Sequence, residues 1–299
     1  MSRHAVLGAG GVGLALAAAL ARGGEDVTLL LRPASLARYG GRVTVRQGLR
    51  EGFTVAVPAA ARLTGPTDVL WVCVKHPDLP GALSTVAAVD PAVGVVVPLL
   101  NGTGHLPPLR ERFGDRVVAG SIRIEATRTA VGEVRQESLF TEIELAGPPE
   151  VVAEALTAAG IGCTDGGSEA DVLWRKLALL APLALATTCA GGPLDAVRAD
   201  EDLTRLMLAC ADEACAAGRA EGARLDRGRV LRALTRAPGR TRTSLQRDVE
   251  RGEAGELDAI AGPVREAGAR HAIPTPATDE LVHRARHDAG TPLPAGNRE

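Results

Sequence analysis

Aromatic side chains are scarce in this chain, making up 2% of its 299 residues. A core with so few rings has to be built from Leu, Val and Ala, so we expect helices that pack closely through small residues. The five cysteines are odd in number and lack CxxC spacing, which argues against a disulfide framework and against a cysteine-based metal site. We therefore expect reduced, buried thiols and no metal.

A surplus of either charge is also missing, because the formal net charge is −2. Proteins that bind nucleic acid normally carry a strong basic surplus, so we expect no nucleic-acid partner. One apolar run, residues 5–21, follows a short basic start much as in a signal peptide, but its regularly spaced glycines indicate another use. We expect no other stretch to be long and apolar enough to span a bilayer, and hence a cytoplasmic protein with no membrane partner.

Strand and helix patterns alternate along the first part of the chain, up to about residue 165. Residues 68–74 and 94–100 are almost continuously apolar, which is typical of strands buried on both faces. After about Gly167, helical periodicity replaces the strand pattern. The sequence thus predicts an α/β fold, with a Rossmann-type dinucleotide-binding domain at residues 1–167 and an all-α substrate and catalytic domain at residues 168–299. The other expected strands are 4–7, 26–31, 42–47, 53–57, 117–126, 131–136 and 142–145, with a hairpin turn at 48–52 and a frayed tail at 291–299.

Helix signals in the second part are specific enough to predict individual features. Asp226 is expected to cap the helix that follows it. Pro182 and Pro263 are expected to kink or interrupt their helices, because proline removes a helix hydrogen bond. One apolar stripe has the spacing of a buried helix face, and it consists of Leu203, Leu206, Met207, Cys210 and Ala214.

A glycine motif stands between the first expected strand and the first expected helix. The segment reads Gly8-Ala9-Gly10-Gly11-Val12-Gly13, which fits G-x-G-x-x-G in the context that a dinucleotide site requires. Gly8 is expected to permit the tight turn, Gly10 to let the pyrophosphate approach the backbone, and Gly13 to let helix and strand pack closely. The N-terminus of the helix offers unpaired N–H groups to the phosphates.

Arg32 follows the second strand, at the position where a dinucleotide site reads the ribose. An NAD-selective site usually has an acidic residue here, but the last acid before it, Asp26, lies at the start of the strand. An arginine pairs well with a 2′-phosphate and gains little from a hydroxyl. The residue therefore indicates NADP(H), with Ser35 and Arg38 as neighbours that could assist. The alternative is a solvated arginine at a strand end.

Polar residues also follow the two long apolar strands. Lys75 comes after residues 68–74, and Asn101 after residues 94–100. Ligands of open α/β sheets bind beyond the carboxyl ends of the strands, so Lys75 could meet a phosphate or carboxylate, and Asn101 the nicotinamide, ribose or substrate. Alternatively, Lys75 is simply solvated and Asn101 only shapes the turn with Gly102.

Lys176 lies on the apolar stripe of its helix, four residues from both Val172 and Leu180. A lysine in that place either extends its ammonium group to water or is partly desolvated beside a ligand. Desolvation would lower its pKa and ease proton donation. Periodicity alone does not distinguish the two interpretations.

With these residues in view, the chain resembles the ketopantoate reductase (2-dehydropantoate 2-reductase) family almost from end to end. The lysine segment and the Ser…Glu segment are the specific part, because other Rossmann dehydrogenases share only the glycines. The residues that carry the resemblance are Gly8 to Gly13, Arg32, Lys75, Asn101-Gly102, Trp174-Arg175-Lys176-Leu177, and Thr243-Ser244-Leu245-Gln246-Arg247-Asp248 leading to Glu256-Leu257-Asp258.

The resemblance implies NADPH-dependent reduction of a 2-oxo acid to a 2-hydroxy acid, with ketopantoate converted to pantoate in pantothenate biosynthesis. It makes Lys176 the general acid, Glu256 the residue that orients Lys176 and contacts the substrate hydroxyl, and Ser244 the ligand of the substrate carboxylate. Asn101 and Lys75 would line the junction of cofactor and substrate. A homodimer is a further possibility.

The chain departs from the family at three substrate positions. Leu180, Ala184 and Thr241 stand where the family usually has asparagine. The cofactor and acid chemistry remain, but the substrate is open. The alternatives are a related NADP-dependent oxidoreductase acting on a more apolar 2-oxo acid or an imine, and a catalytically silent NADP-binding sensor, against which the retention of Lys176 and Glu256 argues.

Overall fold

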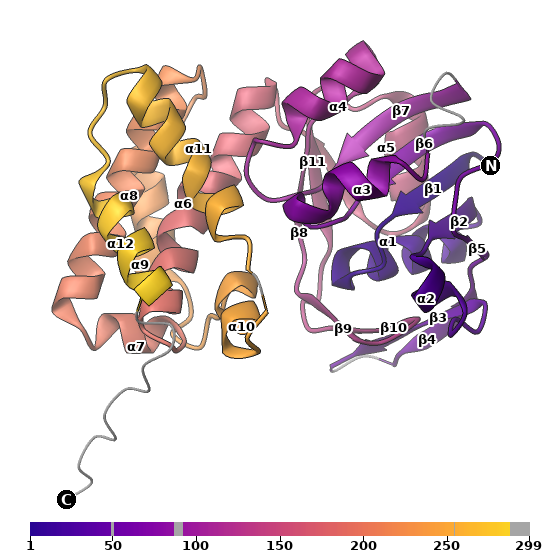
Figure 1. Cartoon of the computed structure of the whole chain (residues 1–299), viewed down its shortest axis with the longest axis horizontal. Coiled ribbons are helices and arrows are strands. Elements are labelled where there is room, and N and C mark those ends of the chain that lie inside the picture. Colours follow the sequence, from indigo (N-terminus) through magenta and orange to yellow (C-terminus); the bar gives the residue numbers. More distant parts are fainter. Residues whose placement is uncertain (49–50, 87–91, 254, 288–299) are drawn as a thin grey trace, which may run out of the picture. The chain divides into compact units, whose positions relative to one another are not determined.

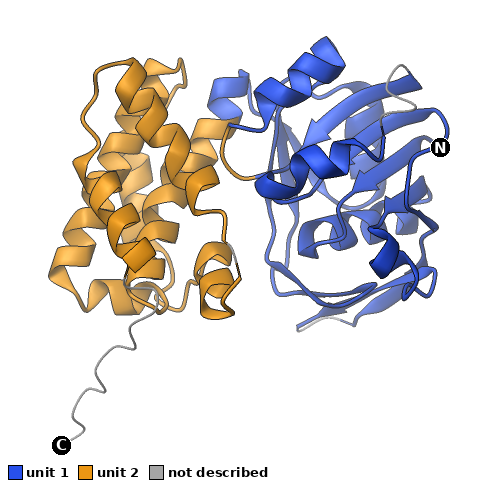
Figure 2. Cartoon of the chain, in the orientation of Figure 1, with its two compact units in different colours: residues 1–100, 104–172 blue, residues 101–103, 173–299 orange. Residues whose placement is uncertain are grey.

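The computed structural model describes residues 1–48, 51–86, 92–253 and 255–287, and it divides into two compact units. Unit 1 comprises residues 1–100 and 104–172, and unit 2 comprises residues 101–103 and 173–299 (Figure 2). Part of the expected turn at 48–52 and the whole expected tail at 291–299 lie outside the described residues.

Unit 1 is built on a parallel sheet in the strand order β5-β2-β1-β6-β7 (Figure 1). This is the order of a Rossmann half-sheet extended across its switch point, where ligands bind beyond the carboxyl ends of the strands. Val6, Leu29, Trp71 and Val97 are fully buried at its centre, as the continuous apolar runs predict. The strands are β1 (Arg3–Leu7), β2 (Asp26–Leu30), β5 (Ala59–Ala60), β6 (Thr67–Val72) and β7 (Val93–Pro98).

Helices and short 3-10 turns connect these strands. The first, α1, follows the glycine motif and is buried along most of its length, because Leu and Ala fill its core-facing positions. The helical elements of unit 1 are α1 (Gly11–Arg22), α2 (Pro33–Leu36), η1 (His76–Asp78), α3 (Leu79–Leu83), α4 (Leu106–Phe113), η3 (Gly114–Arg116) and α5 (Glu150–Ala158).

Two smaller sheets extend unit 1. The expected hairpin is present as the antiparallel pair β3 and β4, but the single strand expected at 117–126 is wrong. It divides into β8 and β9, which belong to different sheets, because the backbone of Glu125 between them bonds to Glu137 and Ser138 instead of continuing a ladder. One sheet contains β4 (Phe53–Ala56), β3 (Arg42–Gln47), β10 (Glu133–Gln136) and β9 (Ala126–Ala130), and the other β12 (Gly162–Asp165), β11 (Glu142–Leu145) and β8 (Gly120–Arg123).

The described part of unit 2 contains helices and no strands, which confirms the α/β fold with an all-α second part. The expected cap is present, since the Asp226 side chain accepts from the Arg229 N–H at 3.1 Å. The expected stripe on α8 is buried. Neither Pro182 nor Pro263 ends its helix. The helices are α6 (Glu169–Cys189), α7 (Leu194–Arg198), α8 (Glu201–Ala220), α9 (Arg227–Arg236), α10 (Ser244–Glu250), α11 (Leu257–Arg270) and α12 (Pro276–His287).

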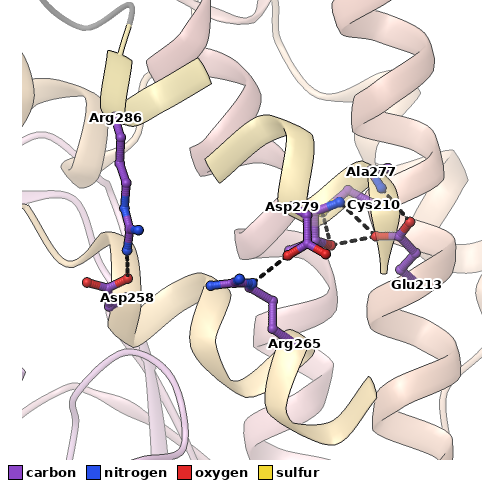
Figure 3. A network of polar contacts seen from close by, with 8 residues as sticks. Cys210, Glu213, Asp258, Arg265, Ala277, Asp279 and Arg286 are labelled. Carbon is purple, nitrogen blue, oxygen red and sulfur yellow. Dashed lines mark hydrogen bonds and ion pairs between the residues drawn. The ribbon is translucent and has the colours of Figure 1, made fainter. Parts of the chain in front are cut away.

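Polar contacts fasten α12 to the rest of unit 2 (Figure 3). The Glu213 carboxylate of α8 accepts from the backbone N–H groups of Ala277 and Thr278 at 2.7 and 2.8 Å, and from the Thr278 hydroxyl at 2.6 Å. Arg265 of α11 pairs with Asp279 at 2.6 Å. A carboxylate is thus held at the positive end of α12, where it satisfies orphan donors and stabilises the helix dipole.

Helix α6 is long and apolar enough to cross a membrane by length and composition. This corrects the expectation that no stretch beyond residues 5–21 would qualify. Of its most apolar window, 67% is buried inside the chain, which is the pattern of a core helix. The boundary between the units falls within α6, after Val172, a few residues beyond the expected one at 167.

Candidate active site

The glycine motif forms a tight turn between β1 and α1. Gly8 has a φ of 110°, a conformation that favours glycine. A Cβ on Gly13 would lie 1.9 Å from the carbonyl oxygen of Gly8, and a Cβ on Gly8 would lie 2.8 Å from the carbonyl carbon of Cys73. Both positions therefore need glycine so that helix and strands can approach each other.

Gly11 and Gly10 differ sharply in their surroundings. A Cβ on Gly11 would lie 2.0 Å from the carbonyl oxygen of Ala126 in β9, whereas a Cβ on Gly10 would meet nothing within 4 Å. The sequence motif gave no signal for the contact of Gly11, because β9 is far away in the chain. The space beside Gly10 is open, and Gly10 is the N-cap of α1 without a side chain to cap the first-turn amides. This geometry fits the pyrophosphate of a dinucleotide.

Arg32 lies two residues beyond the end of β2 and is the N-cap of α2. Its side chain is 75% exposed, and its Nη2 lies 2.7 Å from Oδ2 of Asp78 in η1, which is 46% exposed. Sequence reasoning missed Asp78, because the ion pair joins two elements that are separated by four strands along the chain. Lys75, the N-cap of η1, is half-buried beyond the end of β6.

Asn101 belongs to unit 2 and is hydrogen-bonded to Glu256. The Asn101 Nδ2 donates to Oε2 of Glu256 at 2.9 Å. The next residue, Gly102, has a φ of 77°, and a Cβ there would lie 1.9 Å from the carbonyl oxygen of Ala259. Glycine is thus required for the 101–103 turn to pack against α11, which begins with Glu256 as its N-cap.

Lys176 of α6 is half-buried, and this burial lowers its pKa to about 8. The carboxylate of Glu256 acts in the opposite direction and raises the pKa. The lowered pKa favours the desolvated interpretation of Lys176, which stays a prediction. Within unit 2, three of the expected residues form one group, in which Glu256 stabilises the ammonium of Lys176 and accepts a hydrogen bond from Asn101.

The remaining expected substrate residues lie on α6 and α10. Leu180 is half-buried, Ala184 has no exposed surface, and Ser244 is exposed in the first turn of α10. The hydroxyls of Thr187 and Thr243 are 3.1 Å apart and join the two helices in the core. Thr243 also caps α10, accepting from the Gln246 N–H at 3.3 Å, so the pair fixes the turn that carries Ser244.

Among the described residues, no group of three or more His, Cys, Asp or Glu side chains is placed to hold a metal ion. The Lys176 group itself offers an ammonium that releases its proton more readily than an ordinary lysine, and a carboxylate that stabilises the charged form.

Comparisons with known proteins find similarity over nearly the whole chain. Residues 4–148 match the family described as "Ketopantoate reductase PanE/ApbA", and residues 170–288 match its C-terminal family. A 2-dehydropantoate 2-reductase of Caulobacter vibrioides is 30% identical over 94% of this chain and 97% of its own. The solved structure of a 2-dehydropantoate 2-reductase from Geobacter metallireducens is 26% identical, with a TM-score of 0.85 over 95% of this chain and 99% of that one. The structure of a D-mandelate dehydrogenase with NADH and anilino(oxo)acetate is 17% identical, with a TM-score of 0.84 over 96% of this chain and 98% of that one, and shares the fold.

Proposed function

This chain belongs to the ketopantoate reductase family, and from that membership we propose that it reduces 2-dehydropantoate (ketopantoate) to pantoate with NADPH, a step of pantothenate biosynthesis. Family membership makes it an oxidoreductase that reduces a 2-oxo acid with a nicotinamide cofactor. The observation that carries the proposal is the group of Lys176, Glu256 and Asn101 in unit 2.

Lys176 is the general acid of the proposed reaction. With a pKa of about 8 it is mostly protonated at neutral pH, yet it gives up its proton more easily than an ordinary lysine. The proton moves from Nζ to the carbonyl oxygen of the 2-oxo acid, which becomes the hydroxyl of the product. Glu256 stabilises the ammonium before transfer, and the hydrogen bond from Asn101 holds the carboxylate of Glu256 in place.

Most of the residues that hold the cofactor belong to unit 1. Gly8, Gly10, Gly11, Val12 and Gly13 form the turn and helix end for the pyrophosphate, as the open space beside Gly10 supports. Arg32 pairs with the 2′-phosphate of NADPH, and Lys75 and Asn101 contact the cofactor beyond the strand ends. When bound, the nicotinamide supplies the hydride that reduces the carbonyl carbon.

The substrate is held by residues of unit 2. Ser244, exposed in the first turn of α10, binds the carboxylate, and Asn101, Lys176 and Glu256 bind the oxo group and the hydroxyl. Leu180 lines the remaining space without offering a hydrogen bond, whereas Ala184 has no exposed surface with which to contact the substrate. Leu180 favours a second candidate function, the reduction of a more apolar 2-oxo acid or of an imine by the same chemistry.

A panel assay tests the proposal. We expect NADPH consumption with 2-oxo acids, ketopantoate among them, and loss of that consumption in Lys176→Ala. Consumption with apolar oxo acids or imines alone would favour the second candidate. NADPH binding without consumption of any substrate would identify a sensor and contradict the assignment of Lys176 as an acid.

The cellular compartment and the oligomeric state of this protein are two further predictions. We expect a cytoplasmic enzyme that acts on a small molecule and binds neither nucleic acid nor membrane, and we propose a homodimer, which sedimentation of the purified protein would test.

A further inference from the structure

Arg32 is paired with an acid that the sequence around it does not contain. The separation of 2.7 Å between Arg32 Nη2 and Asp78 Oδ2 is that of a charge-assisted hydrogen bond. Asp78 is the last residue of η1, which follows β6, whereas Arg32 follows β2. Both side chains are largely open to solvent, so a ligand that reaches one of them also reaches the neighbourhood of the other.

Arginine and a carboxylate are the two side-chain types that recognise the 2′-position of the adenosine ribose. An arginine accommodates the 2′-phosphate of NADP, and a carboxylate accepts a hydrogen bond from the 2′-hydroxyl of NAD. Dinucleotide sites usually take the carboxylate from the end of the second strand. Here that strand ends in Leu30 and is followed by Arg32, and the carboxylate comes from η1 instead.

We propose that Asp78 is a cofactor-selecting residue that works against Arg32, so that the enzyme prefers NADPH only narrowly and also accepts NADH. This inference rests on the proposed function, because it assumes that Arg32 reads the 2′-position. The guanidinium has five N–H donors, enough to hold Asp78 and a 2′-phosphate together. The phosphate then lies close to a carboxylate of the same charge, which weakens its binding.

NADH carries a 2′-hydroxyl in place of the phosphate, and this group interacts differently with Arg32 and Asp78. Its 2′-hydroxyl brings no charge to Arg32, but it can donate a hydrogen bond to the Asp78 carboxylate. One hydrogen bond of this kind changes affinity by roughly two- to tenfold. Asp78 thus lowers the affinity for NADPH and raises the affinity for NADH, and the two fold-changes multiply in the ratio of the dissociation constants.

Asp78→Asn removes the charge with little risk to the fold. Asp78 is exposed and stands at the N-cap of α3, but its side chain makes no capping hydrogen bond. The matched control is Asp115→Asn, an exposed acid of η3. Its neighbour Arg116 donates to the carbonyl oxygen of Val93 at the start of β7, so Asp115 belongs to the amino edge of the sheet, opposite the edge where ligands bind.

The experiment is a fluorescence titration of the full chain with NADPH and with NADH, in the native protein, Asp78→Asn, Asp115→Asn and Arg32→Ala. We expect Asp78→Asn to bind NADPH more tightly and NADH more weakly, shifting the ratio of dissociation constants by about tenfold. Asp115→Asn should leave the ratio within about twofold of the native value. In Arg32→Ala the unopposed Asp78 should make NADH bind at least as tightly as NADPH.

The ratio separates selection from structural damage, because a distorted site would weaken both cofactors together. If both cofactors bind and Asp78→Asn leaves their ratio unchanged, or changes it no more than Asp115→Asn does, the role of Asp78 is overturned while the proposed function stands. If the native protein binds neither cofactor, the proposed function falls as well.

Discussion

A lysine that donates a proton in every turnover has to be charged before the reaction and able to lose that charge during it. Lys176 meets both conditions because burial lowers its pKa to about 8, while Glu256 keeps it from falling further. An ordinary exposed lysine titrates near pH 10.4 and would be a weaker acid. The position of this pKa has a direct kinetic consequence.

We predict that kcat/KM for reduction is level below about pH 8 and falls above it, approaching tenfold per pH unit, because only the protonated form of Lys176 donates. The measurement is initial NADPH oxidation between pH 6 and about pH 10. Lys176→Ala, with residual activity, should lack this step. A native profile that stays level through this range would mean that the essential proton comes from another group.

We expect substrate choice to depend on Leu180, which is half-buried and four residues from Lys176 on the same helix. Ketopantoate carries a hydroxyl beyond its oxo-acid group, and leucine cannot hydrogen-bond to it. Leaving such a hydroxyl buried and unpaired costs roughly 1–3 kcal/mol. We therefore predict that 2-oxoisovalerate, with a plain branched tail, competes well with ketopantoate in the native enzyme.

The comparison is kcat/KM for the two acids in the native enzyme and in Leu180→Asn, which should shift the preference toward ketopantoate by about tenfold or more. A native preference for ketopantoate of several orders of magnitude would show that another residue or a water molecule binds the hydroxyl.

At single positions, the sequence predicts the role of a residue where that role depends on residues adjacent to it in the chain. Gly8 and Gly13 are necessary for the turn itself, since a Cβ at either position would clash with the backbone. The contact of Gly11 with β9 and the pairing of Arg32 with Asp78 depend on how distant segments pack. The pKa of Lys176 likewise depends on Glu256, which joins it only in the folded chain.

Among the elements, α12 is held at its first turn by one carboxylate of α8. Glu213 satisfies two backbone N–H groups and one hydroxyl at its first turn. We predict that Glu213→Ala lowers the free energy of unfolding by about 1–3 kcal/mol, because it leaves these donors partly buried without an acceptor. Urea denaturation measures the change.

The control for Glu213→Ala is Glu266→Ala, which removes an exposed carboxylate from α11. It should change stability by less than about 0.5 kcal/mol, as is usual for surface positions. Equal losses in the two variants would show that the contacts at the start of α12 contribute little.

Elements with strong local signals were predictable. The buried strands, the hairpin, the cap of α9 and the stripe of α8 all follow from period, turn chemistry and side-chain capping. The division of residues 117–126 into β8 and β9 was not, because both halves have strand pattern and only the bonds of Glu125 to distant partners separate them. Sheet membership is a property of long-range pairing.

For the whole molecule, the composition and the change of periodicity predict two domains. They do not predict which segments of the chain belong to each domain. Asn101–Thr103 join unit 2 although they follow a strand of unit 1, because Gly102 packs against α11 and Asn101 bonds to Glu256. The glycine turn and Arg32 belong to unit 1, whereas Lys176, Glu256 and Asn101 belong to unit 2. Cofactor binding and acid chemistry should therefore be separable by mutation.

We predict opposite kinetic effects for one change in each unit. Lys176→Ala should lower kcat by roughly 10²–10⁴-fold, the usual scale for losing a general acid, and leave the dissociation constant of NADPH nearly unchanged. Gly10→Val should do the reverse. Its side chain has room in the fold, since a Cβ there meets nothing within 4 Å, but it occupies the space that the pyrophosphate needs.

We expect Gly10→Val to raise KM for NADPH by about ten- to a hundredfold, the scale of one to a few kcal/mol of steric conflict, and to keep kcat near the native value at saturating cofactor. Circular dichroism should show native helix content in both variants. The two effects can be opposite only if the glycine turn binds the cofactor without taking part in proton transfer, and Lys176 transfers the proton without holding the cofactor. A loss of NADPH affinity in Lys176→Ala as large as that in Gly10→Val would contradict this division of roles.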